Sequence, residues 1–369
     1  MSLTSINNVK NYLCLNFKER EEIVDGILAA VISQENCLLI GQPGTAKGNL
    51  VMEFSKCFQN LFYFQWLLTK YTVPEEIYGA LSLKELEIGV YKRNTASKLP
   101  EAHIAFLDEI FKSSSAILNT LLTVINEKLY HNNGTPVRVP LISVFGASNE
   151  YPEEDESLEA LDDRFIIRFE VEYIKDNTNF LSLLQNGINT ANRPLISLKD
   201  ITDLQEMTRK ITVGNDILET IVNIKEEMGQ EGIIVSDRRW YKSLGVIKAN
   251  AAINGCQAVD FSHLEILKNV LWRRPDERKT IAPIVKKFCT DQFGQILQDF
   301  LQQVEEIKVN ALKDKSTDSG TEANKKIKMI QAELKKIKSD NPARAASVDA
   351  FEIKIKSINS VILTECLGL

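Results

Sequence analysis

Residues 37–48 read Cys37-Leu38-Leu39-Ile40-Gly41-Gln42-Pro43-Gly44-Thr45-Ala46-Lys47-Gly48, an apolar run followed by a glycine-containing loop with a lysine near its end. An unbroken apolar run is typical of a strand buried on both faces of a parallel sheet. From Asn49 onward, apolar residues recur at helical spacing. A loop between such a strand and a helix N-terminus presents backbone N–H groups and a lysine ammonium to phosphate oxygens. The stretch therefore predicts a phosphate-binding loop, and a glycine turn with a surface lysine is the alternative.

The predicted nucleotide contacts lie in this loop and at the residue that follows it: Gly41, Gln42, Pro43, Gly44, Thr45, Ala46, Lys47, Gly48 and Asn49. Gly41 and Gly44 allow a close backbone approach that a Cβ would block. Ala46 stands where such loops usually have a second glycine, which is a mild change. Gly48 stands where they usually have Ser or Thr, whose hydroxyl binds Mg²⁺. We therefore expect weaker Mg²⁺ binding and slow turnover.

A second apolar stretch, residues 104–107, ends in the adjacent carboxylates Asp108 and Glu109. Asp108 can hold the Mg²⁺ shell, and Glu109 can orient and polarise an attacking water. An acidic pair at the start of a helix is the alternative interpretation. Because the pair follows a phosphate loop along the chain, we favour the nucleotide site.

Three more polar side chains are candidates because of their positions next to predicted elements. Asn149 follows a predicted strand and can hydrogen-bond a γ-phosphate or the water; an ordinary turn residue is the alternative. Arg164 precedes a predicted strand and could reach the γ-phosphate of a neighbouring subunit, whereas a surface Asp–Arg pair is the competing view. Arg238 opens a predicted helix that Asp237 or Ser236 caps, and it could fold down on the nucleotide.

Strands and helices alternate over residues 17–172, which predicts an α/β layered domain with a parallel sheet. The strand candidates are residues 37–40, 62–67, 104–107, 141–146 and 165–171. Residues 195–272 have helical patterns and few strand signals. From about residue 280, apolar residues recur in steps of three and four, which predicts a helical hairpin or a three-helix region with a polar turn at 313–320. We divide the chain into a nucleotide-binding core (1–175), a linker and helical domain (176–279) and a helical C-terminal region (280–369).

The composition limits the class of protein. The chain has 369 residues, 44 % hydrophobic and 25 % charged, which is typical of a globular protein with more than one domain. No apolar run approaches the ~20 residues needed to cross a bilayer, and the N-terminus has no secretory apolar segment, so we expect a soluble, cytoplasmic protein. The net charge of −6 argues against a general electrostatic grip on nucleic acid. Six scattered cysteines and three distant histidines argue against a structural zinc site.

Several motifs together resemble the MoxR family of AAA+ ATPases, and more narrowly its RavA subfamily. They are GQPGTAKG (41–48), YTVPEEIYGALSLKEL (71–86), LPEAHIAFLDEIFKSSSAILNTLLTVINEK (99–128), FGASNEYPEEDESLEALDDRF (145–165) and VSDRRWYKS (235–243). The resemblance covers about residues 36–272. It implies an αβα core with a small all-α lid, an insert at about 73–100 and a hairpin at about 128–140 with Gly134 at its tip.

The resemblance also implies roles for individual residues. Lys47 would be the phosphate-loop lysine, and Asp108 and Glu109 the metal and water residues. Asn149 would be sensor 1, Arg164 the arginine finger and Arg238 sensor 2, with Arg239 as its nearest rival. The implied cofactors are ATP and Mg²⁺. Members of the family form hexameric rings and act as chaperone-like remodelling ATPases, often with a partner that has a von Willebrand factor A domain.

Three function classes follow from these observations. The first is an ATP-driven remodelling enzyme. The second is a nucleotide-gated assembly scaffold or switch, in which Gly48 leaves binding but little hydrolysis. The third is a DNA-translocating motor, which we disfavour because the core is acidic and the hairpin offers only Lys128, His131 and Arg138.

Overall fold

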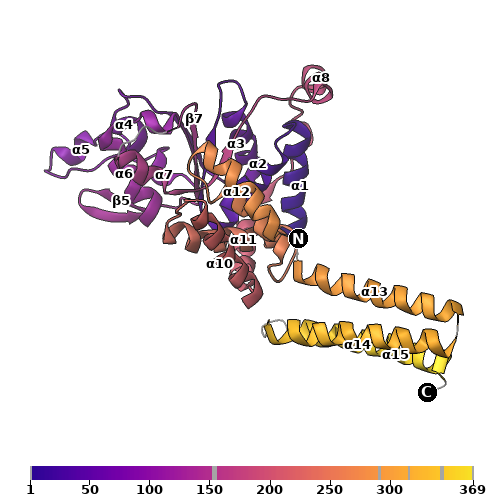
Figure 1. The fold of residues 1–369 in the computed structure, drawn as a ribbon. Helices are drawn as coiled ribbons and strands as arrows, with labels where there is room; N and C mark the ends of the chain where they lie inside the picture. Colours follow the sequence, from indigo (N-terminus) through magenta and orange to yellow (C-terminus); the bar gives the residue numbers. More distant parts are fainter. Residues whose placement is uncertain (1, 152–155, 290–291, 315, 341–344, 368–369) are drawn as a thin grey trace. The chain divides into compact units, whose positions relative to one another are not determined.

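A computed structural model describes residues 2–151, 156–289, 292–314, 316–340 and 345–367 (Figure 1). Residues 152–155 of the quoted motif at 145–165 lie outside this description. The chain divides into two compact units. One comprises residues up to Val213 together with Lys225–Val285, and the other comprises Gly214–Ile224 and the residues from Lys286 on.

The first unit is built around a five-stranded sheet. In spatial order its strands are β3 (Tyr63–Leu67), β4 (Ile104–Asp108), β7 (Ser143–Ser148), β1 (Asn36–Ile40) and β8 (Phe165–Glu170). All four neighbouring pairs are parallel. Every residue of β1 and β7 is buried, as expected of unbroken apolar strands with helices on both faces. The predicted parallel sheet is therefore confirmed.

Helices cover both faces of this sheet because alternate side chains of each strand point to opposite faces. Leu38, Ile40 and Leu107 share a core with α6 (Ser115–Glu127) and with Leu161 of α7 (Glu156–Asp162). The other face packs against α2 (Glu21–Ser33) and α3 (Lys47–Ser55), where the ring of Phe54 meets Phe145 edge-on. Helix α1 (Ser2–Asn16) packs against α2 and α3. The result is an αβα sandwich.

The predicted insert and hairpin form one connected projection. The insert contains α4 (Pro74–Tyr78), α5 (Leu83–Leu86) and η1 (Leu99–Glu101), and the hairpin pairs β5 (Leu129–Asn132) with β6 (Thr135–Arg138). Its turn residues Asn133 and Gly134 have φ of +56° and +71°, as a tight hairpin turn requires. The side-chain oxygens of Asn132 and Asn133 accept hydrogen bonds from backbone N–H groups of the insert, at Arg93 (2.8 Å) and Tyr91 (3.1 Å).

Lys128 does not add a free positive charge to this hairpin, contrary to its place among the three basic hairpin candidates. Its ammonium turns back and donates to the carbonyl of Ile142 at 3.4 Å. Burial lowers the pKa of Lys128 to about 8. Of the three candidates, His131 and Arg138 lie on the hairpin strands themselves.

Helices follow the sheet. They are α8 (Asn177–Asn186), α9 (Leu198–Lys210), α10 (Asn215–Gln230), α11 (Asp237–Ile253), η3 (Phe261–Asn269) and α12 (Pro275–Phe288), and a two-residue strand β9 (Ile196–Ser197) pairs with β2 (Phe58–Gln59). Helix α11 packs on α2 and α9. Ser236 caps α11 by accepting from the Arg239 N–H, as expected of a serine before a helix.

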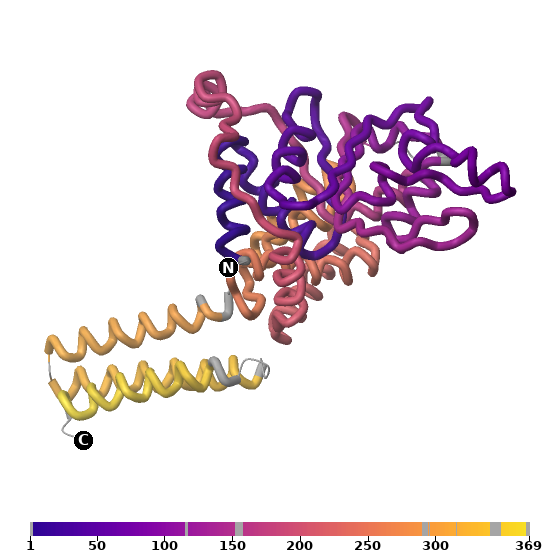
Figure 2. Tube along the Cα trace, turned by 180° about the vertical axis from the view of Figure 1, so that it is seen from behind, coloured from indigo at the N-terminus to yellow at the C-terminus, as the bar shows by residue number. Residues whose placement is uncertain are grey.

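The second unit contains three long helices that lie side by side (Figure 2): α13 (Gln292–Asp314), α14 (Thr317–Asp340) and α15 (Ala345–Ile362), followed by the short η5 (Leu363–Leu367). Buried residues at heptad-like spacing form its core, among them Leu297, Val304, Leu334 and Ile355. The structure selects the three-helix alternative. The polar turn predicted at 313–320 is shorter than expected, because Ser316 accepts from the Ser319 N–H and starts α14 early.

The described part of the chain contains no helix that is both long and apolar enough to cross a membrane. All six cysteines are free thiols, and Cys37, Cys57 and Cys366 are buried. Burial raises the pKa of Cys57 to about 12, so this thiol is protonated at neutral pH.

Candidate nucleotide-binding site

The predicted phosphate loop connects β1 to α3, and its glycines have two different roles. A Cβ on Gly41 would lie 2.2 Å from the carbonyl oxygen of Val171, so only glycine fits there. Gly44 has open space around it, but its φ of +81° favours glycine. Ala46 also adopts a left-handed conformation, with φ of +65°. This explains why such loops usually have glycine at that position, and it places a strained residue directly before Lys47.

Lys47 is the first residue of α3, and its side chain folds back into the loop. Its Nζ donates to the carbonyls of Gly41 (2.5 Å) and Gln42 (3.1 Å) and to Oδ1 of Asn149 (3.1 Å). Burial lowers the pKa of Lys47, and the nearby Asp108 and Glu109 carboxylates oppose this shift. The ammonium is therefore held at the mouth of the loop, where phosphate oxygens can replace the carbonyls.

Asn149 links this lysine to the acidic pair. Its Nδ2 donates to Oε1 of Glu109 at 2.5 Å, while its Oδ1 accepts from Lys47. Glu109 is held in a left-handed backbone conformation, with φ of +52°, and Lys112 pairs with its other carboxylate oxygen at 3.2 Å. Asp108 Oδ1 accepts from the Glu109 N–H at 3.0 Å. The structure thus brings Lys47, Asn149 and Glu109 into one hydrogen-bonded chain at the C-terminal edge of the sheet.

The ring of Phe106 lies against the position at which a Ser or Thr side chain would begin in the usual loop. A Cβ built on Gly48 would lie 3.2 Å and 3.4 Å from two ring carbons of Phe106, and 3.9 Å from Nε2 of Gln65. Phe106 belongs to β4, two residues before Asp108. The ring of Phe106 therefore lies close to the space that a Ser or Thr side chain at position 48 would need. Asp108 remains available to hold a hydrated Mg²⁺.

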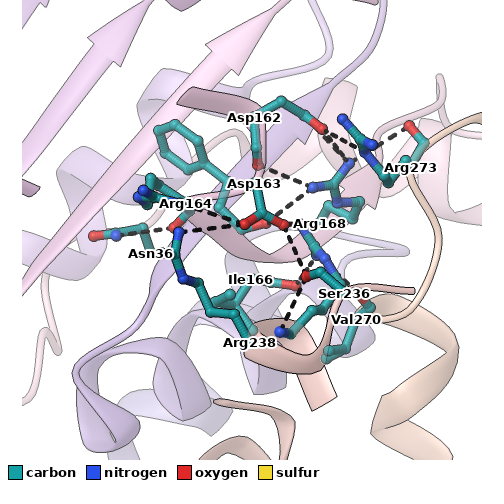
Figure 3. Close-up of polar contacts among 12 residues, drawn as sticks. Asn36, Asp162, Asp163, Arg164, Ile166, Arg168, Ser236, Arg238, Val270 and Arg273 are labelled. Atoms are coloured by element: carbon teal, nitrogen blue, oxygen red, sulfur yellow. Dashed lines mark hydrogen bonds and ion pairs between the residues drawn. The ribbon is translucent and has the colours of Figure 1, made fainter. Parts of the chain in front are cut away.

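The arginine candidates lie at the opposite ends of the strands, where the parallel strands begin. Phe165 is in register with Asn36 at the start of β1, so Arg164 lies at the N-terminal edge, whereas the phosphate loop leaves the C-terminal end of β1. A strand of this length separates the two edges by about 17 Å. Arg164 and Arg238 meet there on one carboxylate oxygen of Asp163, with Nη1 atoms at 3.3 Å and 3.5 Å (Figure 3).

In this structure Arg238 therefore does not lie over the phosphate loop of its own chain. Helix α11 packs on α2, and Ser236 at its start donates to Oδ1 of Asp163 at 3.3 Å. These contacts place the beginning of α11 beside the N-terminal edge of β8, not over the phosphate loop. Arg164 forms an ion pair with the adjacent Asp163, as the alternative of a surface Asp–Arg pair proposed. However, only 20 % of the Arg164 side chain is exposed.

Comparison with known proteins agrees with this architecture. Residues 4–209 match the model of the MoxR domain in the MoxR-vWA-beta-propeller ternary systems, and residues 216–285 match an AAA lid domain. The first match covers more than half of the chain. The chain belongs to the MoxR family of AAA+ ATPases. The predicted fold class, with its αβα core, small all-α lid and helical C-terminal region, is confirmed.

Individual relatives of this MoxR-family chain are similar over most of their length. Uncharacterized protein MJ0079 of Methanocaldococcus jannaschii is 34 % identical over 360 residues, covering 95 % of this chain and 94 % of that protein. Uncharacterized protein MJ0812 of the same organism is 36 % identical over 315 residues, or 84 % of each chain. Chaperone MoxR1 of Mycobacterium tuberculosis is 22 % identical over 277 residues, covering 69 % and 71 %.

A solved structure supports the fold alone. It is that of a protein from Cytophaga hutchinsonii, described as a candidate ATPase, which matches with a TM-score of 0.57 and 18 % sequence identity. The match covers 76 % of this chain and 86 % of that one. At this identity it supports the MoxR architecture and carries nothing about residue roles.

Arg239, the rival of Arg238 for the sensor role in this MoxR chain, is a structural residue. Its side chain is 1 % exposed, and its guanidinium donates to the carbonyls of Phe165 (3.2 Å), Ile166 (3.0 Å) and Val270 (2.8 Å). Burial lowers the pKa of Arg239 to about 9. Because both Nη atoms donate to backbone carbonyls of this chain, Arg239 ties α11 to β8.

A pocket that no sequence motif indicated lies beside the phosphate loop. This cavity of about 380 Å³ is lined by Asn16, Phe17, Lys18, Arg20, Gly44, Thr45, Ala46, Tyr173, Ile174, Phe180, Leu183 and Ile188. Apolar walls next to phosphate-binding backbone fit a nucleoside. The apolar residues of α8 could have indicated it. No residue of α8 is buried, and its apolar Phe180 and Leu183 line this pocket.

Tyr173 connects the segment after β8 to the phosphate loop, because its hydroxyl donates to the carbonyl of Pro43 at 3.0 Å. We expect Tyr173→Phe to weaken ATP binding roughly threefold, since one neutral hydrogen bond that positions the loop is lost. The measurement is the Kd of a fluorescent ATP analogue. Tyr241→Phe is the matched control, because Tyr241 is an exposed tyrosine that does not line this pocket. An unchanged Kd for Tyr173→Phe would contradict a positioning role.

The structure also gathers three potential metal ligands that the sequence spacing did not suggest. The ligand atoms of Cys256, Asp260 and His263 lie within 4.8 Å of one another. However, His263 Nδ1 accepts from the Asp260 N–H at 3.0 Å, and Asp260 Oδ1 accepts from the Ser262 N–H at 2.9 Å. These bonds cap η3, so the helix start accounts for the cluster, and we assign no metal to it.

Proposed function

We propose that this MoxR-family protein binds ATP with Mg²⁺ and hydrolyses it between subunits of a ring to remodel or assemble a partner protein. The observation that carries the proposal is the hydrogen-bonded chain of Lys47, Asn149 and Glu109 at the edge of the sheet where the phosphate loop lies. In this site Lys47 would contact the β- and γ-phosphates and Asp108 would hold the hydrated Mg²⁺. Glu109 would polarise the attacking water, which Asn149 would help to orient. The metal would neutralise charge that develops on the phosphate oxygens.

The arginine positions support a site that is shared between subunits. Arg164 and Arg238 are separated from the phosphate loop of their own chain by the length of a strand, about 17 Å. An arginine side chain cannot span this distance, so these residues would act on the nucleotide of a neighbouring subunit. Head-to-tail contacts of this kind close into rings when the rotation permits. A hexamer is the size that the family resemblance implies.

The nature of the partner follows from the family alone. The matching domain model is described for systems that also contain a vWA component, which supports a partner with a von Willebrand factor A domain. The name of Chaperone MoxR1 supports a chaperone-like role. The narrower RavA-like assignment and a cytoplasmic location rest on sequence and are part of this proposal. Steady-state ATP hydrolysis by the wild-type chain, with and without Mg²⁺, tests the proposal directly.

A second function, a nucleotide-gated switch with little hydrolysis, is favoured by the Gly48–Phe106 contact. If the missing hydroxyl limits turnover, Gly48→Ser should raise it, but the new Cβ would press on the Phe106 ring at 3.2 Å. We therefore expect a clear gain, roughly tenfold or more in kcat, only when Gly48→Ser is combined with Phe106→Leu. Phe106→Leu alone is the matched control.

Phosphate release across a Mg²⁺ titration measures this effect. A gain in the double variant with a lower Mg²⁺ requirement would identify the absent hydroxyl as the limit on turnover. Unchanged turnover in a folded double variant that still binds ATP would contradict the switch explanation.

A further inference from the structure

Two consecutive carboxylates at the N-terminal edge of the sheet have different surroundings. Asp162 is buried, and both of its carboxylate oxygens accept from Nη1 of Arg168 at 3.2 Å. The side chain of Asp163 is 22 % exposed and has only weak partners. Asp162 therefore neutralises a buried arginine, whereas Asp163 contacts Arg164 and Arg238 (Figure 3).

Asp163 shares its charge among several donors at long distances. Its Oδ2 meets Arg164 at 3.3 Å and Arg238 at 3.5 Å, and its Oδ1 meets Ser236 at 3.3 Å and Arg239 at 3.7 Å. Charge-assisted hydrogen bonds of good geometry are 2.7–2.9 Å long. None of these contacts reaches that length, so an anion with more oxygens and more charge can compete for the arginines.

This cluster contains more positive than negative charge. Five guanidinium groups, those of Arg164, Arg168, Arg238, Arg239 and Arg273, form ion pairs with only two carboxylates, Asp162 and Asp163. Within these pairs, five positive charges minus two negative charges leave a surplus of three. Among the described residues, the buried Nε atoms of Arg164, Arg168 and Arg239 have no hydrogen-bond partner. Together with the surplus charge, this indicates that the arginine cluster can accept a further anion.

We propose that Asp163 binds, in a free subunit, the two arginines that bind the γ-phosphate of ATP in the neighbouring subunit after assembly. In a free subunit it holds Arg164 and Arg238 together, and a neighbouring ATP takes both arginines from it, because guanidinium groups bind phosphate oxygens in bidentate geometry. Asp163 then keeps its contacts with Ser236 and Arg239, so the start of α11 stays attached to β8. ADP has no γ-phosphate and leaves the arginines on Asp163. This inference rests on the proposed function, in which the arginines act between subunits.

Asp163 is thus a positioning residue, and its removal should alter how subunits discriminate ATP from ADP. We expect Asp163→Asn to lower the protein concentration needed for assembly with a non-hydrolysable ATP analogue roughly tenfold, since the γ-phosphate no longer has to displace a charged partner of the arginines. Assembly with ADP should change much less, because ADP does not displace Asp163. Asp163→Glu, which keeps the charge, should retain the wild-type preference. The measurement is oligomer size against protein concentration by light scattering with each nucleotide.

Asp162→Asn is the matched control, because it removes the neighbouring carboxylate and leaves buried Arg168 without its counter-charge. It should lower the melting temperature without selectively favouring assembly with the ATP analogue. A wild-type ratio of assembly with the ATP analogue and ADP in Asp163→Asn would overturn the proposal. Failure of Asp163→Asn to fold would also overturn it by assigning a structural role. If instead mixtures of Arg164→Ala and Glu109→Gln subunits show no shared site, it is the proposed function that fails.

Discussion

Glu109→Gln is expected to reduce steady-state ATP hydrolysis by about 10²–10⁴-fold while leaving ATP binding intact. The amide keeps the size of the side chain and can still accept the hydrogen bond from Asn149 Nδ2, so the site should keep its shape. It lacks the negative charge that polarises the attacking water. Phosphate release measures turnover, and a fluorescent ATP analogue measures binding in the same preparation.

Glu127→Gln is the matched control, because Glu127 is an exposed glutamate at the end of α6. It should hydrolyse ATP at the wild-type rate. Hydrolysis by Glu109→Gln within a factor of two of wild type would show that Glu109 is not the base. Bound ATP without turnover in the wild-type chain would favour the nucleotide-gated switch, and the Gly48–Phe106 contact would then be its cause.

Arg164→Ala is expected to lower kcat by about 10³-fold or more, because a guanidinium that stabilises the transferring phosphoryl group is lost. Mixing this variant with Glu109→Gln should restore activity. In mixed rings, an intact Glu109 from one subunit meets an intact Arg164 from the other at roughly a quarter of the interfaces. A site contained within one chain cannot be restored in this way. Phosphate release across mixing ratios is the measurement, and a bell-shaped dependence is the expected result.

Arg209→Ala provides the control, since Arg209 is an exposed arginine of α9. Its mixture with Glu109→Gln should only dilute the wild-type activity. Arg238→Ala should behave like Arg164→Ala, because both arginines meet on Asp163. Activity in the Arg164→Ala mixture that merely adds the two separate activities would contradict a shared site.

Much of the candidate site could be predicted because parallel strands bring their carboxyl ends to one edge. Asn149 and Glu109 each follow a buried strand, and β7 lies beside β4 in the sheet, so their side chains meet. The position of Arg238 could not be predicted in this way. Its helix α11 is attached by packing on α2 and by Arg239, and a helical pattern shows that one face is buried but not which element that face packs against.

The sequence by itself determined the parallel sheet, the phosphate loop and the acidic pair, because apolar runs, glycines and strand-end residues act through local geometry. Only the tertiary structure decided that Arg238 lies beside Arg164, where the strands of the sheet begin. It also decided that Phe106 faces Gly48 and that Asp163 collects Arg164 and Arg238. The physical reason is that these contacts join residues far apart along the chain. Such contacts exist only after strands and helices have packed, and no local propensity encodes them.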